Sequence, residues 1–462
     1  MATGQSSPGP IIETLSKYMV EARTSALPAD VARKTKHHIL DTIGAMVSGA
    51  TLDPGKLAIK YAGLQGGAPE AQVMASSLLT NAVNAALANG ILAHADETDD
   101  SHAQSATHPG CAVVPAALAM AEKNNSSGRT LVNAVALGYD VGCRIMRALR
   151  TGNPFEGNRG RNFSSHAMGG VFGAAAAASA CTDFNSRQLR HLLSYTAQQA
   201  SGITSWQADA EHIEKAFDFA GMPARNGVTS ATMVEAGFTG VEDVFEGYNN
   251  FFDSYSTSPN RDAVIEELGS RYEVMLTNIK KYCVGSPIQA PVDALLNIMR
   301  QHSVGYDQFE KMVAFTSSGE SRLTGAEQSM PDINLRYLLA VSLLDGDLSF
   351  EAGHDFERMR DETVVDICNR IEVRADPSLV TPESPRQGVI ELTTKDGQTF
   401  RDHVVVVHGA MENPLTTEEL EHKERPLLSM VLGEAKSDRL IAAIWDLESL
   451  DSVRDLRPML TP

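Results

Sequence analysis

The segment ETDDSHAQSATHP, which runs from Glu97 to Pro109, places three carboxylates and two histidines in one short stretch. Carboxylates that lie close together raise one another's pKa, so one of them can stay protonated and donate a proton. His102 and His108 add imidazoles, which titrate near neutral pH. His108 precedes a proline and is therefore expected in extended backbone, on a loop that faces the start of the next helix. This combination predicts general acid–base chemistry.

Two other interpretations of this segment stay open on spacing alone, a solvated acidic loop and a metal site. Asp and His at such spacing can hold manganese or iron, although no H-E-x-x-H or similar motif supports a metal. One observation argues against a simple solvated loop. Four carboxylates directly follow an expected helix over 81–95, namely Asp96, Glu97, Asp99 and Asp100. The helix macrodipole disfavours negative charge at this end by about 0.3–1 kcal/mol for each group. Such a break of a local rule is typical of functional sites.

The stretch GNRGRNFSSHAMGG, residues 157–170, has the composition of a loop that leads into an alanine-rich helix. It brings Arg159, Arg161 and His166 to the expected start of that helix. Arginine side chains and the free N–H groups of a helix N-terminus bind carboxylates or phosphates. His166 is interpreted equally well as a capping or packing residue, so the sequence alone leaves both roles open.

Two more stretches place lysines where they can contact an anionic ligand. In EHIEKAFDFAGMPARNGV, residues 211–228, Lys215 lies between apolar residues, and residues 225–227 are expected at a helix boundary or turn. A lysine on such a face usually extends to water, and the functional alternative is a carboxylate clamp or a proton donor. In NIKKYCVGSPIQAPVDAL, residues 278–295, Lys280 lies at an expected domain junction. Ligand sites are common at such junctions.

Chain length and composition limit the fold and the partners. With 462 residues, two domains are expected, and the 43% of hydrophobic residues is enough to form two cores. The formal net charge of −19 argues against nucleic-acid and anionic-membrane partners, which require a basic face. The five cysteines form no C-x-x-C pair, which argues against a zinc ribbon or a disulfide framework. No signal peptide and no strongly apolar run of about 18 residues is found, so we expect a cytoplasmic location.

The periodicity of apolar residues changes along the chain from helical to strand-like. Asp396-Gly397 predicts a hairpin between two strands. We therefore expect a helical domain over 1–268, joined by 412–462, and a smaller α/β domain over 269–411. Helices are expected over 31–47, 81–95, 115–123, 131–149 and 169–180, the last as a central packed helix, and again from 416 and over 439–450. Strands are expected over 311–317, 370–374, 388–394 and 399–407.

Six stretches in this order resemble the MmgE/PrpD family, and the resemblance covers nearly the whole chain. Each motif alone is weak, but six in the family's order are specific. The six are KHHILDTIGAMVSGA (36–50), HADETDDSHAQSATHPG (94–110), HAMGGVFGAAAAAS (166–179), Lys215 with ARNG (224–227), Lys280-x-Tyr282 with Pro291-x-Asp293, and QSMPDINLRYLLAVSLLDGDL (328–348).

The resemblance implies a mostly α fold, with a large all-helical domain and a smaller α/β lid domain, in a homodimer. It also implies that the protein works without a metal or organic cofactor on a small di- or tricarboxylic acid. The catalytic residues that it implies are Glu97, Asp99, Ser101, His108, His166 and Lys215. The residues expected to bind the carboxylates or the developing charge of the substrate are Arg159, Arg161, Lys280 and Gln289.

The sequence departs from the family pattern in two of these motifs. Gln289 stands where the family has a histidine, and glutamine can bind a carboxylate but cannot exchange a proton near neutral pH. In the Lys215 motif, the family histidine is replaced around Asp218, with one extra residue before Ala224. The first departure makes decarboxylation of cis-aconitate a less favoured expectation, because that histidine belongs to the catalytic set of the decarboxylases.

The expected reaction starts with removal of a proton next to a carboxylate, which forms an enolate whose charge must be stabilised by cations and N–H groups. We expect His108 or His166 to be the base, and Glu97 or the other histidine to protonate a leaving hydroxyl. Dehydration of a 2-methylcitrate-like hydroxy acid is the first expectation. The alternatives are epimerisation or isomerisation of a substituted succinate, cis-aconitate-type decarboxylation, and non-catalytic carboxylate binding.

Overall fold

The computed structural model describes residues 7–149, 162–319, 325, 329–381, 384 and 386–462. The chain folds into two compact units. The helical unit comprises Met1–Ala95, Asp99–Thr277 and Leu420–Pro462, and the α/β unit comprises Asp96–Thr98 and Asn278–Glu419. The sequence placed the limits at 268/269 and 411/412 and did not anticipate that residues 96–98 group with the second unit. The predicted fold class, mostly α with a smaller α/β domain, is confirmed.

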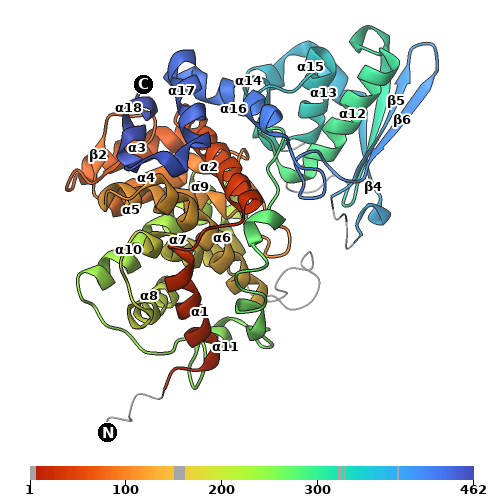
Figure 1. Ribbon diagram of the computed structural model, residues 1–462. Helices are drawn as coiled ribbons and strands as arrows, with labels where there is room; N and C mark the ends of the chain where they lie inside the picture. The colour runs from red at the N-terminus through yellow and green to blue at the C-terminus, as the bar shows by residue number, and fades with distance from the viewer. Residues whose placement is uncertain (1–6, 150–161, 320–324, 326–328, 382–383, 385) are drawn as a thin grey trace. The chain divides into compact units, whose positions relative to one another are not determined.

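The helical unit consists of helices with connections of varied length and carries a two-stranded hairpin, β1 Ala71–Gln72 with β2 Leu79–Thr80 (Figure 1). Among the described residues, none of the helices combines the length and apolarity needed to cross a membrane. The helices are α1 Pro10–Ala22, α2 Ala29–Gly49, α3 Asp53–Gln65, α4 Ala82–Ala93, α5 Gly110–Lys123, α6 Gly128–Leu149, α7 Ser165–Ala180, α8 Ser186–Gln199, α9 Ile213–Ala216, α10 Met222–Glu235, α11 Phe251–Tyr255, α16 Thr417–Leu432, α17 Glu434–Trp445 and α18 Arg457–Leu460.

Helix α7 lies at the centre of this unit and packs against α5, α6 and α10, which confirms its predicted central position. Glycines allow the backbones of α6 and α7 to approach. A Cβ on Gly142 would lie 2.6 Å from the carbonyl oxygen of Gly169, and a Cβ on Gly173 would lie 2.9 Å from that of Gly138. Real Cβ atoms are essentially never found this close to backbone. The small side chains of α7 are therefore required by helix packing.

Two local predictions are wrong. Helix α5 begins at Gly110 and not at Pro115, which lies inside it. The earlier start is stabilised by Asp100, whose Oδ1 accepts the free N–H of Gly110 at 3.0 Å. Residues 225–227 are not a helix boundary but lie within α10. Position 227 requires glycine, because a Cβ there would lie 2.5 Å from the backbone nitrogen of Ala175 in α7.

The α/β unit contains a four-stranded sheet in the order β4-β3-β5-β6 (Figure 1). β3 pairs parallel with β4 and antiparallel with β5, and β5 pairs antiparallel with β6. The predicted hairpin is confirmed, with Gly397 at a φ of 85° in its turn. α12 packs against β5 and β6, and the core continues into α13. The elements are β3 Phe309–Thr316, β4 Ile371–Ala375, β5 Gly388–Thr394, β6 Thr399–Val404, α12 Gln289–His302, α13 Leu335–Asp345, α14 Phe350–Gly353 and α15 Glu362–Asn369.

Replacement of Gly142 by alanine tests the close approach of α6 and α7. We expect Gly142→Ala to lower the free energy of unfolding by about 1–3 kcal/mol, because the added methyl group overlaps the α7 backbone. Gly63→Ala is the matched control, since Gly63 is an exposed helical glycine whose Cβ would meet only Leu78 Cδ2 at 3.8 Å. That variant should be neutral or more stable by up to about 1 kcal/mol. Urea unfolding of both variants measures the difference, and equal stabilities would contradict the packing argument.

Candidate active site

Asp99 lies at the centre of a group of imidazoles in the helical unit. Its Oδ2 is 2.9 Å from Nδ1 of His94, and its Oδ1 is 3.4 Å from Nδ1 of His108. The side chains of Asp99 and His94 are fully buried, whereas that of His108 is 11% exposed. One carboxylate therefore orients two imidazoles, as the carboxylate does in hydrolase triads. Of these two histidines only His108 was predicted.

Asp100 ties the same segment to the surrounding helices. Its Oδ2 is 2.8 Å from Nδ1 of His38 in α2, and it accepts a hydrogen bond from the hydroxyl of Tyr139 in α6 at 2.5 Å. Its other oxygen caps α5 at Gly110. Asp99 and Asp100 are both fully buried, so the interpretation of this segment as a solvated acidic loop is wrong.

His102 is not a neutral-pH group, which corrects the prediction from its residue type. Burial alone would lower its pKa, but the Cys143 thiol and the carboxylate of Glu273, 3.2 Å from Nε2, raise the pKa to about 10. Burial would raise the pKa of Glu273, but His102 together with Arg147 and Arg144 lowers it to about 2. The two groups form a buried ion pair that anchors the loop before His108.

His166 is the second residue of α7 and lies beside His108, with ring centroids 5.0 Å apart. The N-cap of the helix is Ser164, whose hydroxyl oxygen accepts from Ala167 N, so His166 is not the capping residue. Burial of the ring and the neighbouring His108, His94 and Lys215 hold the pKa of His166 well below its usual range. His166 is therefore neutral near pH 7 and able to accept a proton.

Phe219 connects these imidazoles and was not predicted from the sequence. Its ring stacks on His166 with centroids 3.7 Å apart and on His94 with centroids 4.5 Å apart. Trp206 meets Phe219 edge to face at 4.6 Å. The Nζ of Lys215 lies over both aromatic rings, 5.3 Å from the Phe219 centroid and 5.6 Å from that of Trp206. We call these six side chains, His94, His108, His166, Trp206, Lys215 and Phe219, the histidine–aromatic cluster.

A π-helical turn places Phe219 in the cluster. The backbone hydrogen bonds widen from the α to the π pattern over Phe217–Gly221 (η2), between α9 and α10. The motif in which an extra residue was noted thus contains a π-bulge, a feature frequent at functional sites. Asp218 in the same turn is 6% exposed. Burial raises its pKa to about 6, against the lowering by Ser164 and the backbone N–H of Ile203.

Glu97 and Lys280 lie together in the α/β unit. Nζ of Lys280 donates to the backbone oxygen of Glu97 at 2.7 Å and is 3.4 Å from its Oε2. Asp96 forms an ion pair with His354 at 2.9 Å, which raises the pKa of His354 to about 9 in spite of its burial. Ser101, in the helical unit, is 8% exposed. The catalytic or binding roles of Glu97, Lys280 and Ser101 stay predictions.

Gln289 has a structural role that the sequence did not reveal. Its amide nitrogen donates to the carbonyl oxygens of Tyr282 and Val284 at 2.9 and 3.0 Å, and its oxygen accepts from Tyr282 N at 3.1 Å. Both amide hydrogens are therefore used to hold the segment after Lys280, which argues against the predicted contact with substrate. The predicted Arg159 and Arg161 lie outside the described residues.

His94, Asp99 and Cys111 offer metal-ligand atoms within 4.8 Å of one another, and all three are buried. Asp99, however, already directs one oxygen to each of two histidines. Cys111 also directs its Sγ to the carbonyl oxygen of His108 at 3.0 Å. This arrangement favours proton transfer over metal coordination.

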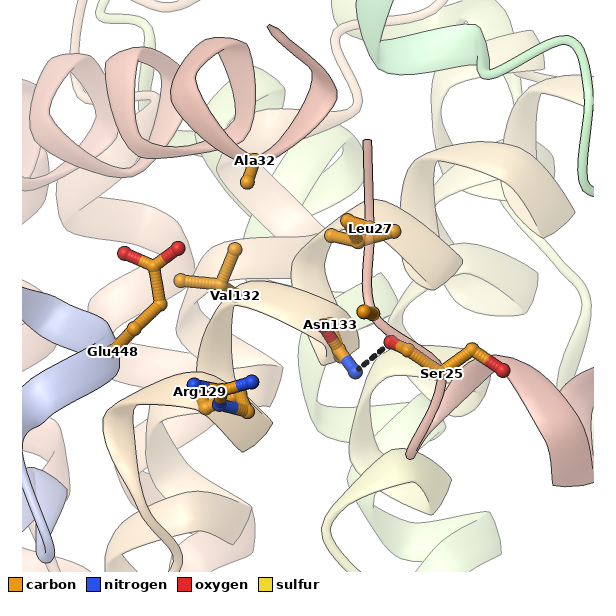
Figure 2. A pocket seen from close by; sticks show the side chains of 8 residues that line it. Ser25, Leu27, Ala32, Arg129, Val132, Asn133 and Glu448 are labelled. Carbon is orange, nitrogen blue, oxygen red and sulfur yellow. Dashed lines mark hydrogen bonds between the residues drawn. The ribbon is translucent and has the colours of Figure 1, made fainter. Parts of the chain in front are cut away.

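A separate surface pocket of the helical unit contains none of these side chains (Figure 2). Asn133 lies on its wall and donates to the backbone oxygen of Ser25 at 3.0 Å. Glu448, also on the wall, pairs with Lys36 at 2.7 Å. Asn133 and Glu448 are thus already paired within the protein, and the pocket lining includes no histidine, so the histidine–aromatic cluster is the better candidate for acid–base chemistry.

Both the N-terminal and the C-terminal part of the chain match a known domain family. Residues 13–263 match the MmgE/PrpD N-terminal domain, and residues 282–448 match the MmgE/PrpD C-terminal domain. The chain belongs to the MmgE/PrpD family. The resemblance noted from six motifs is thereby confirmed.

The curated relatives include MmgE/PrpD proteins that are named as decarboxylases. The cis-aconitate decarboxylase of Homo sapiens is 24% identical, with 97% of this chain and 94% of the relative covered. The cis-aconitate decarboxylase-like protein oryM of Aspergillus oryzae is 23% identical, with 100% of this chain and 99% of the relative covered.

Replacement of Glu273 by glutamine tests the ion pair that anchors the loop. We expect Glu273→Gln to lower the free energy of unfolding by about 3–5 kcal/mol, because His102 and the nearby arginines lose a buried partner. The pKa of His102 is raised in the folded state, so its contribution is complete below about pH 6.5 and is lost as the pH rises towards 10. The pKa of Glu273 is lowered, so its contribution is complete above pH 4.5 and is lost towards pH 2.

The difference in stability between wild type and this variant should therefore be largest at about pH 4.5–6.5 and decrease on both sides. Denaturant unfolding at a series of pH values measures it. As a control, Glu372→Gln removes a carboxylate whose ion pair with Arg374 is more than half exposed. That variant should change stability by less than about 1 kcal/mol at every pH. A pH-independent difference for Glu273→Gln would contradict the assigned charges.

Proposed function

We propose that the protein is a lyase that acts on a small di- or tricarboxylic acid by abstracting a proton next to a carboxylate. The observation that supports this most directly is the placement of the neutral imidazole of His166 beside His108, which Asp99 orients. Two imidazoles in contact, one neutral and one next to a carboxylate, form a pair suited to accept and to donate a proton. Membership of the MmgE/PrpD family supports the same class of reaction.

In this mechanism His166 is the base, because its lowered pKa keeps it unprotonated near neutral pH. His108 is the acid in this proposal, since Asp99, whose Oδ1 is 3.4 Å from its Nδ1, orients the imidazole next to the base. Lys215 binds a substrate carboxylate and offsets the negative charge that develops when the proton leaves. Each proton transfer of this kind contributes about 10²–10⁴-fold to the rate.

Dehydration of a hydroxy acid related to 2-methylcitrate is the reaction that we propose first. After His166 removes the proton, His108 protonates the hydroxyl on the neighbouring carbon, and the C–O bond breaks as the double bond forms. His108 gives up one proton and His166 takes up one, so the elimination of water requires no co-reactant. Glu97 and Ser101 are further candidates for contact with the hydroxyl, as the family resemblance implies.

Decarboxylation is the second candidate, and the names of the curated relatives favour it. In that reaction the C–C bond to a carboxylate breaks, and the histidine acid protonates the resulting carbanion. The engagement of Gln289 with backbone groups is the argument against it, because this position offers no proton donor. Epimerisation would use the same two imidazoles and return the proton to the opposite face of the carbon.

Proton NMR in D2O with EDTA-treated protein distinguishes these reactions. The substrates are citrate, 2-methylcitrate, cis-aconitate, isocitrate and substituted succinates. A vinyl signal with loss of a hydroxy acid establishes dehydration, and consumption of cis-aconitate with release of CO2 establishes decarboxylation. Deuterium that enters an otherwise unchanged acid establishes epimerisation. Binding by calorimetry without any of these changes would contradict the proposed lyase and support a carboxylate-binding protein.

Asp99→Asn is expected to reduce kcat by about 10²–10⁴-fold, because asparagine cannot present an acceptor oxygen to both His94 and His108 and so no longer orients both imidazoles. His166→Ala is expected to reduce kcat by a similar factor, because the base is lost. His422→Ala is the matched control, since this histidine is exposed, and it should retain the wild-type rate. The same NMR assay measures all three, with thermal unfolding to verify folding. Wild-type turnover by both Asp99→Asn and His166→Ala would contradict the proposed mechanism.

A further inference from the structure

His354 is a buried histidine of the α/β unit that the proton transfers described above do not use. It directly follows α14, and its side chain is 10% exposed. Its Nδ1 lies 2.7 Å from the backbone oxygen of Phe350, and its Nε2 lies 2.9 Å from Oδ2 of Asp96. Both of these neighbours are hydrogen-bond acceptors, so both ring nitrogens must carry a hydrogen. The geometry therefore requires an imidazolium cation.

The groups that face this ring favour the cation. Burial alone would lower the pKa of His354, but three groups raise it to about 9, namely Asp96, Asp332 in the turn Pro331–Ile333, and the backbone oxygen of Phe350. The ring of Phe350 also stacks on the imidazole, with centroids 4.1 Å apart. The face of an aromatic ring attracts a cation. His354 is thus charged near neutral pH.

Asp96 uses the carboxylate that pairs with His354 to shape the backbone that follows. Its Oδ1 accepts from the backbone nitrogen of Thr98 at 2.9 Å, and its Oδ2 accepts from the Thr98 hydroxyl at 2.6 Å. A bond from an aspartate to the N–H two residues further on closes an Asx turn. Lys280 donates to the backbone oxygen of Glu97, between them, at 2.7 Å. The α/β unit thus holds all three residues of this turn.

Asp99 is the next residue in the chain. The chain passes from the α/β unit to the helical unit at the peptide bond between Thr98 and Asp99. Beyond that bond, Asp99 directs one oxygen to His94 and the other to His108. Because the peptide bond is rigid and planar, the conformation of residues 96–98 limits the directions in which the side chain of Asp99 can point.

We propose that His354 and Asp96 are positioning residues for the reaction: their ion pair fixes the turn over 96–98, and the turn fixes the carboxylate of Asp99 that orients two imidazoles. Neither residue touches the reacting atoms. The effect on rate rests on the proposed function, whereas the effect on the imidazoles does not. A misplacement of catalytic groups by about 1 Å can cost about 10²-fold in rate.

The kinetics of two variants near pH 7 test this role, with the acid that the NMR panel identifies as substrate. His354→Leu leaves the buried carboxylate of Asp96 without its cation, so kcat should fall by about 10–10²-fold while KM stays within about twofold. Asp96→Asn keeps the turn, because the amide nitrogen can donate to a neutral Nε2 while the amide oxygen still accepts from Thr98. Its kcat should therefore stay within about threefold of the wild type.

His408→Leu is the matched control. His408 belongs to the same unit and also lies beside a carboxylate, that of Glu419 at 3.1 Å, but the two side chains are 30% and 46% exposed. This variant should keep the wild-type kcat and KM. Thermal unfolding of each variant verifies folding.

Nitrogen-15 NMR of labelled histidines tests the same geometry without a substrate. Near pH 7 both ring nitrogens of His354 should be protonated in the wild type, and the proton should be lost at about pH 9. The ring resonances of His94 and His108 should move in His354→Leu and keep their wild-type positions in Asp96→Asn and His408→Leu. Each resonance is assigned by its loss when that histidine is replaced by glutamine.

A loss of rate in Asp96→Asn equal to that in His354→Leu would overturn the proposal, because the charge of Asp96 would then act on the reaction directly. A raised KM with unchanged kcat in His354→Leu would also overturn it, since the pair would then serve substrate binding. If the wild type turns over no acid of the panel, the proposed lyase function fails for these substrates, and the resonances decide on the positioning role alone. Unmoved resonances of His94 and His108 in His354→Leu would overturn that role.

Discussion

The burial of carboxylates is the constraint on which the candidate site depends. Asp96, Asp99 and Asp100 are each at most 2% exposed, and a carboxylate removed from water stays ionised only with charged or hydrogen-bonding partners. The partners are His354 for Asp96, His94 and His108 for Asp99, and His38 and Tyr139 for Asp100. The contacts that offset desolvation are the same contacts that orient the imidazoles. Within each unit, folding and the geometry of the reactive groups are therefore coupled.

Much of the fold could be predicted from the sequence, because periodicity and turn chemistry are local. The small-residue run in α7 indicated close helix packing, and Asp396-Gly397 indicated the β5–β6 hairpin; both are observed. The start of α5 could not be predicted, because it depends on Asp100 from outside the helix. The acid–base segment was predicted from a broken local rule, but its partner His94 lay within the expected helix over 81–95 and was given no role. Its pairing with Asp99 requires the backbone to turn back on itself, which spacing alone does not show.

The remaining features of the site depend on contacts that spacing cannot specify. Gln289 was expected to bind substrate because of its place in a family motif, yet its amide holds the backbone of residues 282–284. His102 was expected to titrate near neutral pH, yet Glu273, far along the chain, raises its pKa to about 10. In both cases the residue type was read correctly and the environment determined the role. The one sign in the sequence of an unusual backbone near these side chains was the extra residue in the Lys215 motif.

The π-turn over Phe217–Gly221 separates the placement of Phe219 from the packing of the helices on either side of it. One added residue rotates a helix by about 100°, and a π-turn confines this rotation to a single turn. Lys215 before the turn keeps its place over the aromatic rings, and Gly227 after it keeps its close contact with α7. Between them, the turn directs Phe219 at the imidazoles, and its ring stacks on His166 and His94. The turn therefore places an aromatic ring between two imidazoles while the helix packing that supports His166 is kept. In this fold a single turn can therefore set the surroundings of the imidazoles separately from the helix packing that holds them in place.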